Sequence, residues 1–478
     1  MQTLQKLFAP RDLTQGNPTT GIALFAIPLL LGNLAQQLYN TVDAYVVGRY
    51  VGDAALGAVG LAGPVLNLMI VLFMGISTGA TIVVSQYFGA RDREAVSRSV
   101  GTTMMLTLWS GVLMSVIGML CARPLLELLG TPEEMLDMAS DYLFIVMLGI
   151  TGMAFYSIMS GVLRGLGDSV SPLFYLLIAS VLNIVLDVAF ITLLGMKTDG
   201  VAWATIISQG VSAVLCFLKL RRMHTLDLNR KTLRIDRPIM NRIVRLGVPA
   251  GMTQMIFSLS SILVQSLTNS LGPNVVTAVT AVMRVDGFAM MPNFTFGVAA
   301  TTFTGQNVGA RRIDRVHQGA KATLLLALGT STVLTACILL FGQGLMRVFT
   351  QTEEIVSMGA VMLQILAVGY IAFAVTQTLQ GVMRGAGETV IPMWISIVTT
   401  VAIRMPIAYL WAYLTRTPEL PAGDPMCLYG SLLISWLLAC LMSVYVYCRG
   451  KWKRRLLWEG TETASPAPNP TGTEGGLS

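Results

Sequence analysis

The sequence predicts an all-α integral membrane protein of twelve transmembrane helices. We expect two parallel six-helix bundles related by a pseudo-two-fold axis along the membrane normal. Three observations predict this class: the composition, the number of long apolar segments and an internal repeat. Of the 478 residues, 54% are hydrophobic and only 12% are charged, whereas soluble domains average roughly 25% charged residues.

Twelve apolar segments are long enough to cross a bilayer, whose core requires roughly 20 helical residues. Glycine and proline occur inside many of them, which membrane-embedded helices tolerate. The segments lie at 21–44, 55–85, 100–121, 139–163, 172–194, 200–219, 243–269, 276–304, 320–341, 357–382, 391–414 and 426–448.

The Lys and Arg residues predict the orientation of these segments. Most of them lie at the two termini and in alternate loops, and the remaining loops contain only Arg49, Arg123, Lys197, Arg347 and Arg416. The positive-inside rule therefore predicts that both termini are cytoplasmic. We expect a multi-pass protein of the bacterial cytoplasmic (inner) membrane, whose net charge of +7 reflects topology and requires no nucleic acid partner.

Five regions follow from the segment boundaries. The central linker is basic, and the end of the chain (TETASPAPNPTGTEGGLS) is too rich in Pro, Gly, Ser and Thr to bury a core. The regions are a cytoplasmic N-terminus at 1–20, an N-terminal six-helix lobe at 21–219, a basic cytoplasmic linker at 220–242, a C-terminal six-helix lobe at 243–448, and a basic then disordered cytoplasmic tail at 449–478.

An internal repeat relates the two halves at an offset of 220 residues. The segment SGVLRGLGD at 160–168 is matched by QGVMRGAGE at 380–388, and SQYFGARD at 85–92 is matched by GQNVGARR at 305–312. Six predicted spans separate matched positions, so the halves have the same orientation. Parallel repeats of this kind occur in transporters whose substrate path lies between the halves. We interpret each RGxG segment as a structural turn in which glycine permits a tight reversal.

The sequence offers no constellation for catalysis. The six cysteines form no CxxC pair, His224 and His317 lie in charged loops, and no GxxxxGK[ST] motif is present. We therefore expect neither an enzyme nor a cofactor, and no direct use of ATP.

Four polar residues of the first half are expected to lie at similar depth inside the membrane. An ionisable group at the centre of a span costs roughly 2.5–3.5 kcal/mol, so Asp43 and Asp187 require an explanation. Asn183 shares a helix face with Asp187, and Thr205 lies on the next span. The structural alternative is that Asp43 lies at a helix end in contact with solvent, and that Asp187 is a structural carboxylate whose hydrogen bonds are all formed. The functional alternative is a site for a coupling proton or, with the same four residues as ligands, for sodium.

The second half has a different set of charged residues. Arg284, Asp286 and Arg404 fall within its spans, and we expect Asp286 and Arg404 to pair across the bundle. Methionine and aromatic side chains nearby would suit an apolar cation, although ordinary helix packing explains any single one of them equally well. The residues expected to line a substrate cavity are Met283, Arg284, Asp286, Met290, Met291, Gln377 and Arg404.

The chain resembles the multidrug and toxic compound extrusion (MATE) transporters. The resemblance rests on the repeat, the SQYFGARD and GQNVGARR segments, the paired RGxG turns and the acidic residue of the first span. The resemblance implies export of amphipathic, usually cationic compounds by alternating access, driven by inward proton or sodium flow. It also implies that Asp43, Asn183, Asp187 and Thr205 match the cation or proton site of the DinF-like branch. Ser258 and Gln377 stand where the NorM-like branch keeps carboxylates, which disfavours coupling through the second lobe.

Two other transporter classes remain as alternatives. A lipid-linked sugar flippase of the same superfamily is expected to line its cavity with several basic residues, and only Arg284 and Arg404 qualify. A major facilitator transporter usually has a longer central loop and halves with different loop signatures. We therefore expect a secondary active efflux transporter that is a monomer, with membrane lipid and a small amphipathic cation as its partners.

Overall fold

The structure is a computed structural model that describes residues 10–128, 131–229, 231–418, 420–450 and 452. Residues 1–9 of the predicted N-terminus and residues 451 and 453–478 of the predicted tail lie outside the described residues. Within the described chain, twelve helices are long and apolar enough to cross a membrane. The predicted fold class and number of spans are confirmed.

The first six spans are built from seven elements. In chain order they are α2 (Pro18–Val46), the π-helical turn η1 (Val47–Val51) that continues it, α3 (Asp53–Gly89), α4 (Arg93–Leu128), α5 (Glu133–Gly165), α6 (Val170–Leu194) and α7 (Thr198–Arg222).

The last six spans are built from eight elements. They are α8 (Arg237–Ser270), α9 (Pro273–Gly309), α10 (Ile313–Arg347), α11 (Glu353–Gly385), the continuous span α12 (Val390–Ser396), η2 (Ile397–Arg404, π-helical) and α13 (Met405–Leu414), and finally α14 (Cys427–Arg449).

Several helices extend beyond the predicted apolar segments at the end where they meet charged loops. The segment predicted to begin at 100 is a helix from Arg93, and the one predicted to begin at 243 is a helix from Arg237. The reason is that a helix satisfies its own backbone hydrogen bonds and does not have to stop where the apolar residues stop.

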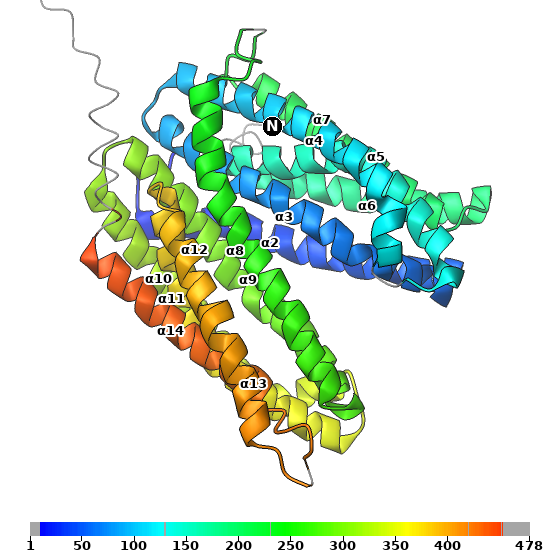
Figure 1. The fold of residues 1–478 in the computed structure, drawn as a ribbon. Helices are drawn as coiled ribbons and strands as arrows, with labels where there is room; N and C mark the ends of the chain where they lie inside the picture. Colours follow the sequence, from blue (N-terminus) through cyan, green and yellow to red (C-terminus); the bar gives the residue numbers. More distant parts are fainter. Residues whose placement is uncertain (1–9, 129–130, 230, 419, 451, 453–478) are drawn as a thin grey trace, which may run out of the picture.

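The helices form two groups, which we call the N-lobe (α2 to α7) and the C-lobe (α8 to α14). Within the N-lobe, α5 packs against α3, α4 and α7; within the C-lobe, α11 packs in the same way against α9, α10 and α14. Each lobe has its own cluster of buried apolar side chains around this central helix. The lobes lie together at the upper left of Figure 1 and diverge from there like the arms of a V.

The predicted repeat recurs in the packing of individual side chains. In the N-lobe, Thr81 Oγ1 on α3 donates a hydrogen bond to the carbonyl oxygen of Gly161 on α5 at 2.8 Å. In the C-lobe, Thr301 Oγ1 on α9 donates to the carbonyl oxygen of Gly381 on α11 at 3.1 Å. Two further equivalent bonds run from Ser115 Oγ to Met147 O at 2.7 Å and from Thr335 Oγ1 to Ala367 O at 2.6 Å.

The two RGxG segments form equivalent turns, as their glycines predict. Gly167 and Gly387 have φ of +87° and +91°, a conformation in which a side chain is strained. The residue that follows each glycine caps the next helix: Asp168 accepts from the backbone N–H of Ser171 at 2.9 Å, and Glu388 accepts from that of Ile391 at 3.1 Å. The interpretation of these segments as structural turns is confirmed.

The lobes meet at one end of the molecule. We call it the basic end, and it contains the connections 90–92, 166–169, 223–236, 310–312 and 386–389; the opposite end is the far end. Here α3 crosses α9 so closely that a Cβ on Gly89 would collide with the carbonyl oxygen of Gln306, and one on Gly309 would collide with that of Gln86. Further along α3, Gly75 lies against Gly251 of α8. Small residues therefore bring the two lobes into backbone contact.

Within the C-lobe, the packing of α11 on α9 allows a test of this close approach. A Cβ on Gly385 would collide with the carbonyl oxygen of Thr301, whereas Gly329 on α10 has open space around it. We expect Gly385→Ala to lower the free energy of unfolding by about 1–3 kcal/mol, the usual cost of overpacking. Thermal unfolding of the purified protein in detergent measures the effect. Gly329→Ala is the matched control and should leave the melting temperature unchanged or slightly raised; equal behaviour of the two variants would contradict the packing described.

Candidate functional site

A cluster of polar side chains lies inside the N-lobe, between α2, α6 and α7. Asp43 stands three residues before the end of α2, and Asn183 and Asp187 lie four residues apart on one face of α6. Thr205 of α7 faces them. Asn183 and Asp187 are fully buried, Thr205 is 9% exposed and Asp43 is half-buried. The structure thus brings the four residues predicted for the coupling site together.

Asn183 connects the helices of this cluster. With its amide assigned the orientation that matches the surrounding donors and acceptors, Nδ2 donates to Asp187 Oδ2 at 3.1 Å and Oδ1 accepts from the backbone N–H of Thr205 at 3.3 Å. A buried amide that is satisfied on both sides holds its neighbours in position, because breaking either bond would leave a buried polar group unpaired. Asn183 therefore fixes the Asp187 carboxylate relative to α7.

The two carboxylates are incompletely satisfied. Asp43 and Asp187 interact directly with one another, yet the Oδ1 atom of each is buried and receives no hydrogen bond from the described residues. Two buried carboxylates cannot both stay ionised side by side without a compensating positive charge. Among the described residues no ion-pair partner provides that charge. The arrangement is chemically suited to hold one proton or one cation.

Two tyrosines complete the surroundings of the carboxylates. Tyr39 lies one helical turn before Asp43 on α2 and interacts with Asp43 and with the hydroxyl of Thr205. Tyr142 of α5 is 6% exposed and interacts with both carboxylates. Neither tyrosine was predicted from the sequence. The i, i+4 spacing of Tyr39 and Asp43 could have indicated the first, whereas Tyr142 lies on a distant span and carries no local signal.

Within the part of the chain that the structure describes, no three His, Cys, Asp or Glu side chains are placed to hold a metal ion. A cation in the N-lobe site would therefore need a mixed set of oxygen ligands. The carboxylates of Asp43 and Asp187, the amide of Asn183 and the hydroxyl of Thr205 are such a set, of the kind that hard cations prefer.

The C-lobe has a carboxylate within one of its spans, the half-buried Asp286, and this carboxylate has a donor. Asp286 Oδ1 on α9 accepts a hydrogen bond of 2.7 Å from the hydroxyl of Tyr370 on α11, and Tyr370 itself is fully buried. The carboxylate of Asp286 thus differs from those of the N-lobe, because a neutral side chain of its own lobe already stabilises it.

The predicted pairing of Asp286 with Arg404 takes a weaker form than expected. The two residues interact electrostatically, but no direct ion pair joins them in the described structure. Arg404 instead donates from Nη1 to Ser260 Oγ on α8 at 3.2 Å, and its Nε is buried without an acceptor among the described residues. The reason lies in the backbone: Arg404 ends the π-helical element η2, whose wider turns change the direction of the side chain relative to an α-helix.

The other residues predicted for a substrate cavity have mixed environments. Met283 is 54% exposed and Arg284 is also exposed, whereas Met291 is half-buried. Met290 packs on the C-lobe core, and Gln377 is buried. Their role in substrate binding stays a prediction.

Comparison with known proteins gives consistent matches over nearly the whole chain. A family model described as MatE matches residues 28–189 and 249–410, which are the two halves of the repeat. The chain is 30% identical to the probable multidrug resistance protein YoeA of Bacillus subtilis (strain 168) over 465 residues, 95% of this chain and 98% of that protein.

Solved structures show the same fold. A crystal structure of a MATE protein in its bent conformation matches with a TM-score of 0.86 and 24% identity, covering 94% of this chain and 98% of the other. The outward-facing conformation of a multidrug resistance MATE family transporter of the MOP superfamily matches with a TM-score of 0.84 and 25% identity, covering 93% and 98%.

The hydrogen bond between Tyr370 and Asp286 leads to a prediction about stability. Tyr370→Phe removes the donor and leaves an oxygen of the half-buried Asp286 carboxylate without this hydrogen bond, so we expect the free energy of unfolding to fall by about 1–3 kcal/mol. Thermal unfolding in detergent measures it. Tyr413→Phe is the matched control, because Tyr413 is 64% exposed. A Tyr370→Phe protein as stable as the control would show that Asp286 does not depend on this bond.

Proposed function

Because the chain belongs to the MatE family of multi-pass membrane transporters, we propose that it exports amphipathic cations across the bacterial cytoplasmic membrane in exchange for protons or sodium ions. The names of its relatives support multidrug efflux. The proposal assigns ion coupling to the N-lobe and assigns export to alternating exposure of the space between the lobes. The membrane potential can contribute roughly 2.3 kcal/mol per charge per 100 mV to inward ion flow.

One observation carries the proposal: the two facing carboxylates of Asp43 and Asp187, each with a buried oxygen that lacks a donor. A proton or a sodium ion between them removes the repulsion of two buried like charges. Binding of the ion therefore changes the energy of any arrangement that moves Asp43 relative to Asp187. Asn183 stabilises the position of Asp187, so α2 is the element whose position the ion controls.

Helix α2 connects this site to the contact between the lobes. It packs on α6 in its own lobe and on α9 and α10 in the other, and Asn33 Nδ2 donates to Thr295 Oγ1 of α9 at 3.0 Å. A ligand shifts a conformational equilibrium only through differential affinity for the two states. Because α2 touches both the ion site and the C-lobe, it can convert occupancy of the site into a preference for one lobe arrangement.

The C-lobe is less suited to bind the coupling ion. Asp286 already has the hydroxyl of Tyr370 as a donor. Ser258, which stands where the NorM-like branch keeps a carboxylate, accepts from Asn67 Nδ2 of the N-lobe at 3.4 Å. These contacts favour the DinF-like arrangement, in which the N-lobe alone binds the ion, and they favour it over the NorM-like one.

The transport assay follows from this assignment. Purified protein is reconstituted into proteoliposomes, and uptake or release of a fluorescent amphipathic cation is followed under an imposed proton or sodium gradient. We expect Asp43→Asn and Asp187→Asn each to reduce gradient-driven transport by roughly 5–150-fold, the range of typical coupling free energies. The gradient that drives the wild-type protein identifies the coupling ion.

Glu94→Gln is the matched control for that assay, because it removes the carboxylate of an exposed residue at the basic end and leaves the N-lobe site intact. It should retain gradient-driven transport. Full transport by Asp43→Asn or Asp187→Asn would exclude the N-lobe site, and loss of coupling in Asp286→Asn alone would move the ion to the C-lobe.

We further propose that the basic end faces the cytoplasm, as the positive-inside rule predicts. In a variant whose six cysteines are replaced by serine, Glu94→Cys at the basic end should react with a membrane-impermeant maleimide only after the cells are opened. Leu420→Cys, in the connection between α13 and α14 at the far end, is 46% exposed and should react in intact cells. The reverse pattern would invert the orientation.

A further inference from the structure

Two glutamines at the basic end form hydrogen bonds that are equivalent under the internal repeat. Gln86 Nε2 on α3 donates to the carbonyl oxygen of Gly385, the last residue of α11, at 3.0 Å. Gln306 Nε2 on α9 donates to the carbonyl oxygen of Gly165, the last residue of α5, at 3.1 Å. Each amide therefore reaches from its own lobe to the end of the central helix of the other lobe.

The oxygen atoms of the two amides also have partners outside their own lobes, but the partners differ. Gln86 Oε1 accepts from Arg242 Nη2 on α8 at 2.7 Å. Gln306 Oε1 accepts from the backbone N–H of Leu13, which precedes α2, at 2.9 Å. Gln86 is 5% exposed and Gln306 is fully buried. The bonds to Gly385, Gly165 and Arg242 join different lobes, so they can form only while the basic end is closed. The bond to Leu13 joins Gln306 to the segment that precedes the N-lobe.

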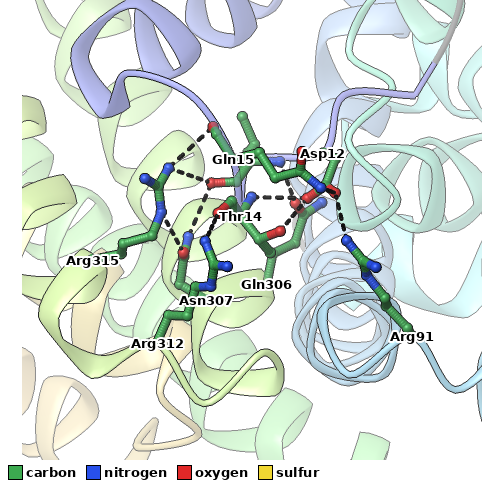
Figure 2. Close-up of polar contacts among 9 residues, drawn as sticks. Asp12, Thr14, Gln15, Arg91, Gln306, Asn307, Arg312 and Arg315 are labelled. Atoms are coloured by element: carbon green, nitrogen blue, oxygen red, sulfur yellow. Dashed lines mark hydrogen bonds and ion pairs between the residues drawn. The ribbon is translucent and has the colours of Figure 1, made fainter.

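The segment Arg11–Gly16 lies across this contact and binds both lobes. On the N-lobe side, the backbone N–H of Arg11 donates to the carbonyl oxygen of Gly167 at 3.1 Å, and Asp12 forms an ion pair of 3.9 Å with Arg91. Figure 2 shows the C-lobe side, where Arg312 and Arg315 of the C-lobe point into the loop of the segment.

The arginine contacts go to backbone oxygens. Arg312 Nη1 donates to the carbonyl oxygen of Thr14 at 2.9 Å. Arg315 donates to the carbonyl oxygens of Leu13 at 3.2 Å, Gln15 at 3.1 Å and Gly16 at 3.0 Å. Charge-assisted bonds of this kind are stronger than neutral ones, so the segment is well held on α10 while its other end is held on the N-lobe.

We propose that Gln86 and Gln306 are positioning residues of the transport cycle, which hold the basic end closed while the far end is open, with segment 11–16 fastened across them. The inference rests on the proposed function only in requiring that the lobes move. Neutral amides suit such a contact. They lose their partners without leaving a buried charge, and water that enters on opening can satisfy them again.

The test measures the separation of the lobes directly. Glu94 on α4 and Asp314 on α10 are exposed residues at equivalent positions of the two repeats, at the basic end. Both are changed to cysteine in a variant whose six cysteines are replaced by serine, and spin labels are attached. Distances are then measured by electron spin resonance in lipid nanodiscs. We expect Gln86→Ala and Gln306→Ala each to raise the ratio of the longer-distance (open) to the shorter-distance (closed) population roughly tenfold, as for loss of a buried hydrogen-bonded group.

Ser115→Ala is the matched control. It removes a buried bond from a side chain to a backbone carbonyl, at 2.7 Å, that lies wholly within the N-lobe, so the population ratio should stay at the wild-type value. A glutamine variant whose ratio equals that of the control would overturn the proposal. Gln86→Asn, which shortens the side chain by one carbon and loses the same contacts, provides a second variant if Gln86→Ala does not fold.

The role of the segment is tested separately with the double change Arg312→Ala and Arg315→Ala. We expect the same shift toward the open population, because the segment then loses its arginine contacts on the C-lobe; an unchanged ratio would remove the segment from the closing device. The distance measurement requires neither an ion gradient nor a transported compound. If Asp43→Asn transports normally while the glutamine variants open the basic end, the proposed ion site is wrong and this inference stands. If Asp43→Asn loses transport while the glutamine variants leave the population ratio unchanged, the ion site stands and this inference is wrong.

Discussion

The close crossing of α3 and α9 is the constraint on which the arrangement of the two lobes depends. At Gly89 and Gly309 the backbones approach so closely that no larger residue fits. One turn earlier on each helix, Gln86 and Gln306 can therefore reach across to the opposite lobe. The rest of the V shape in Figure 1 follows from this contact, because helices of fixed length that cross at one end must diverge at the other.

The two lobes thus share one arrangement of helices but have chemically different interiors. The N-lobe leaves buried carboxylate oxygens of Asp43 and Asp187 without donors, whereas the C-lobe supplies a tyrosine hydroxyl to Asp286. Unsatisfied buried polar atoms are costly, and proteins retain them mainly where they have a use. The asymmetry therefore separates a lobe whose buried carboxylate oxygens lack donors from a lobe in which Asp286 already has one. Helix α2 contacts both lobes, so in the proposed cycle it would transmit the effect of ion binding.

The sequence predicted the fold and the members of the N-lobe site because both leave local signals. Apolar segments of the length of a bilayer, a repeat with an offset of about 220 residues and the spacing of Asn183 and Asp187 can all be recognised along the chain. Contacts between distant spans cannot be recognised in this way. Tyr142 joins the site from α5, and Arg404 turns toward Ser260 because a π-helical element changes its direction. Gln86 and Gln306 lie inside the repeated segments SQYFGARD and GQNVGARR. The groups that their side chains bind in the other lobe include backbone carbonyls, however, and no residue pattern identifies those.

The reciprocal bonds of Gln86 and Gln306 have the form of an isologous interface, in which the same patch of two subunits meets itself. Here both copies of the patch belong to one chain and are joined by the connection 223–236 between α7 and α8. Separation of the two halves is therefore never a dissociation. A short tether keeps the effective concentration of one half near the other at roughly millimolar levels, so that even individually weak bonds re-form in every cycle, and the rate of closure does not depend on how many copies of the protein the membrane contains.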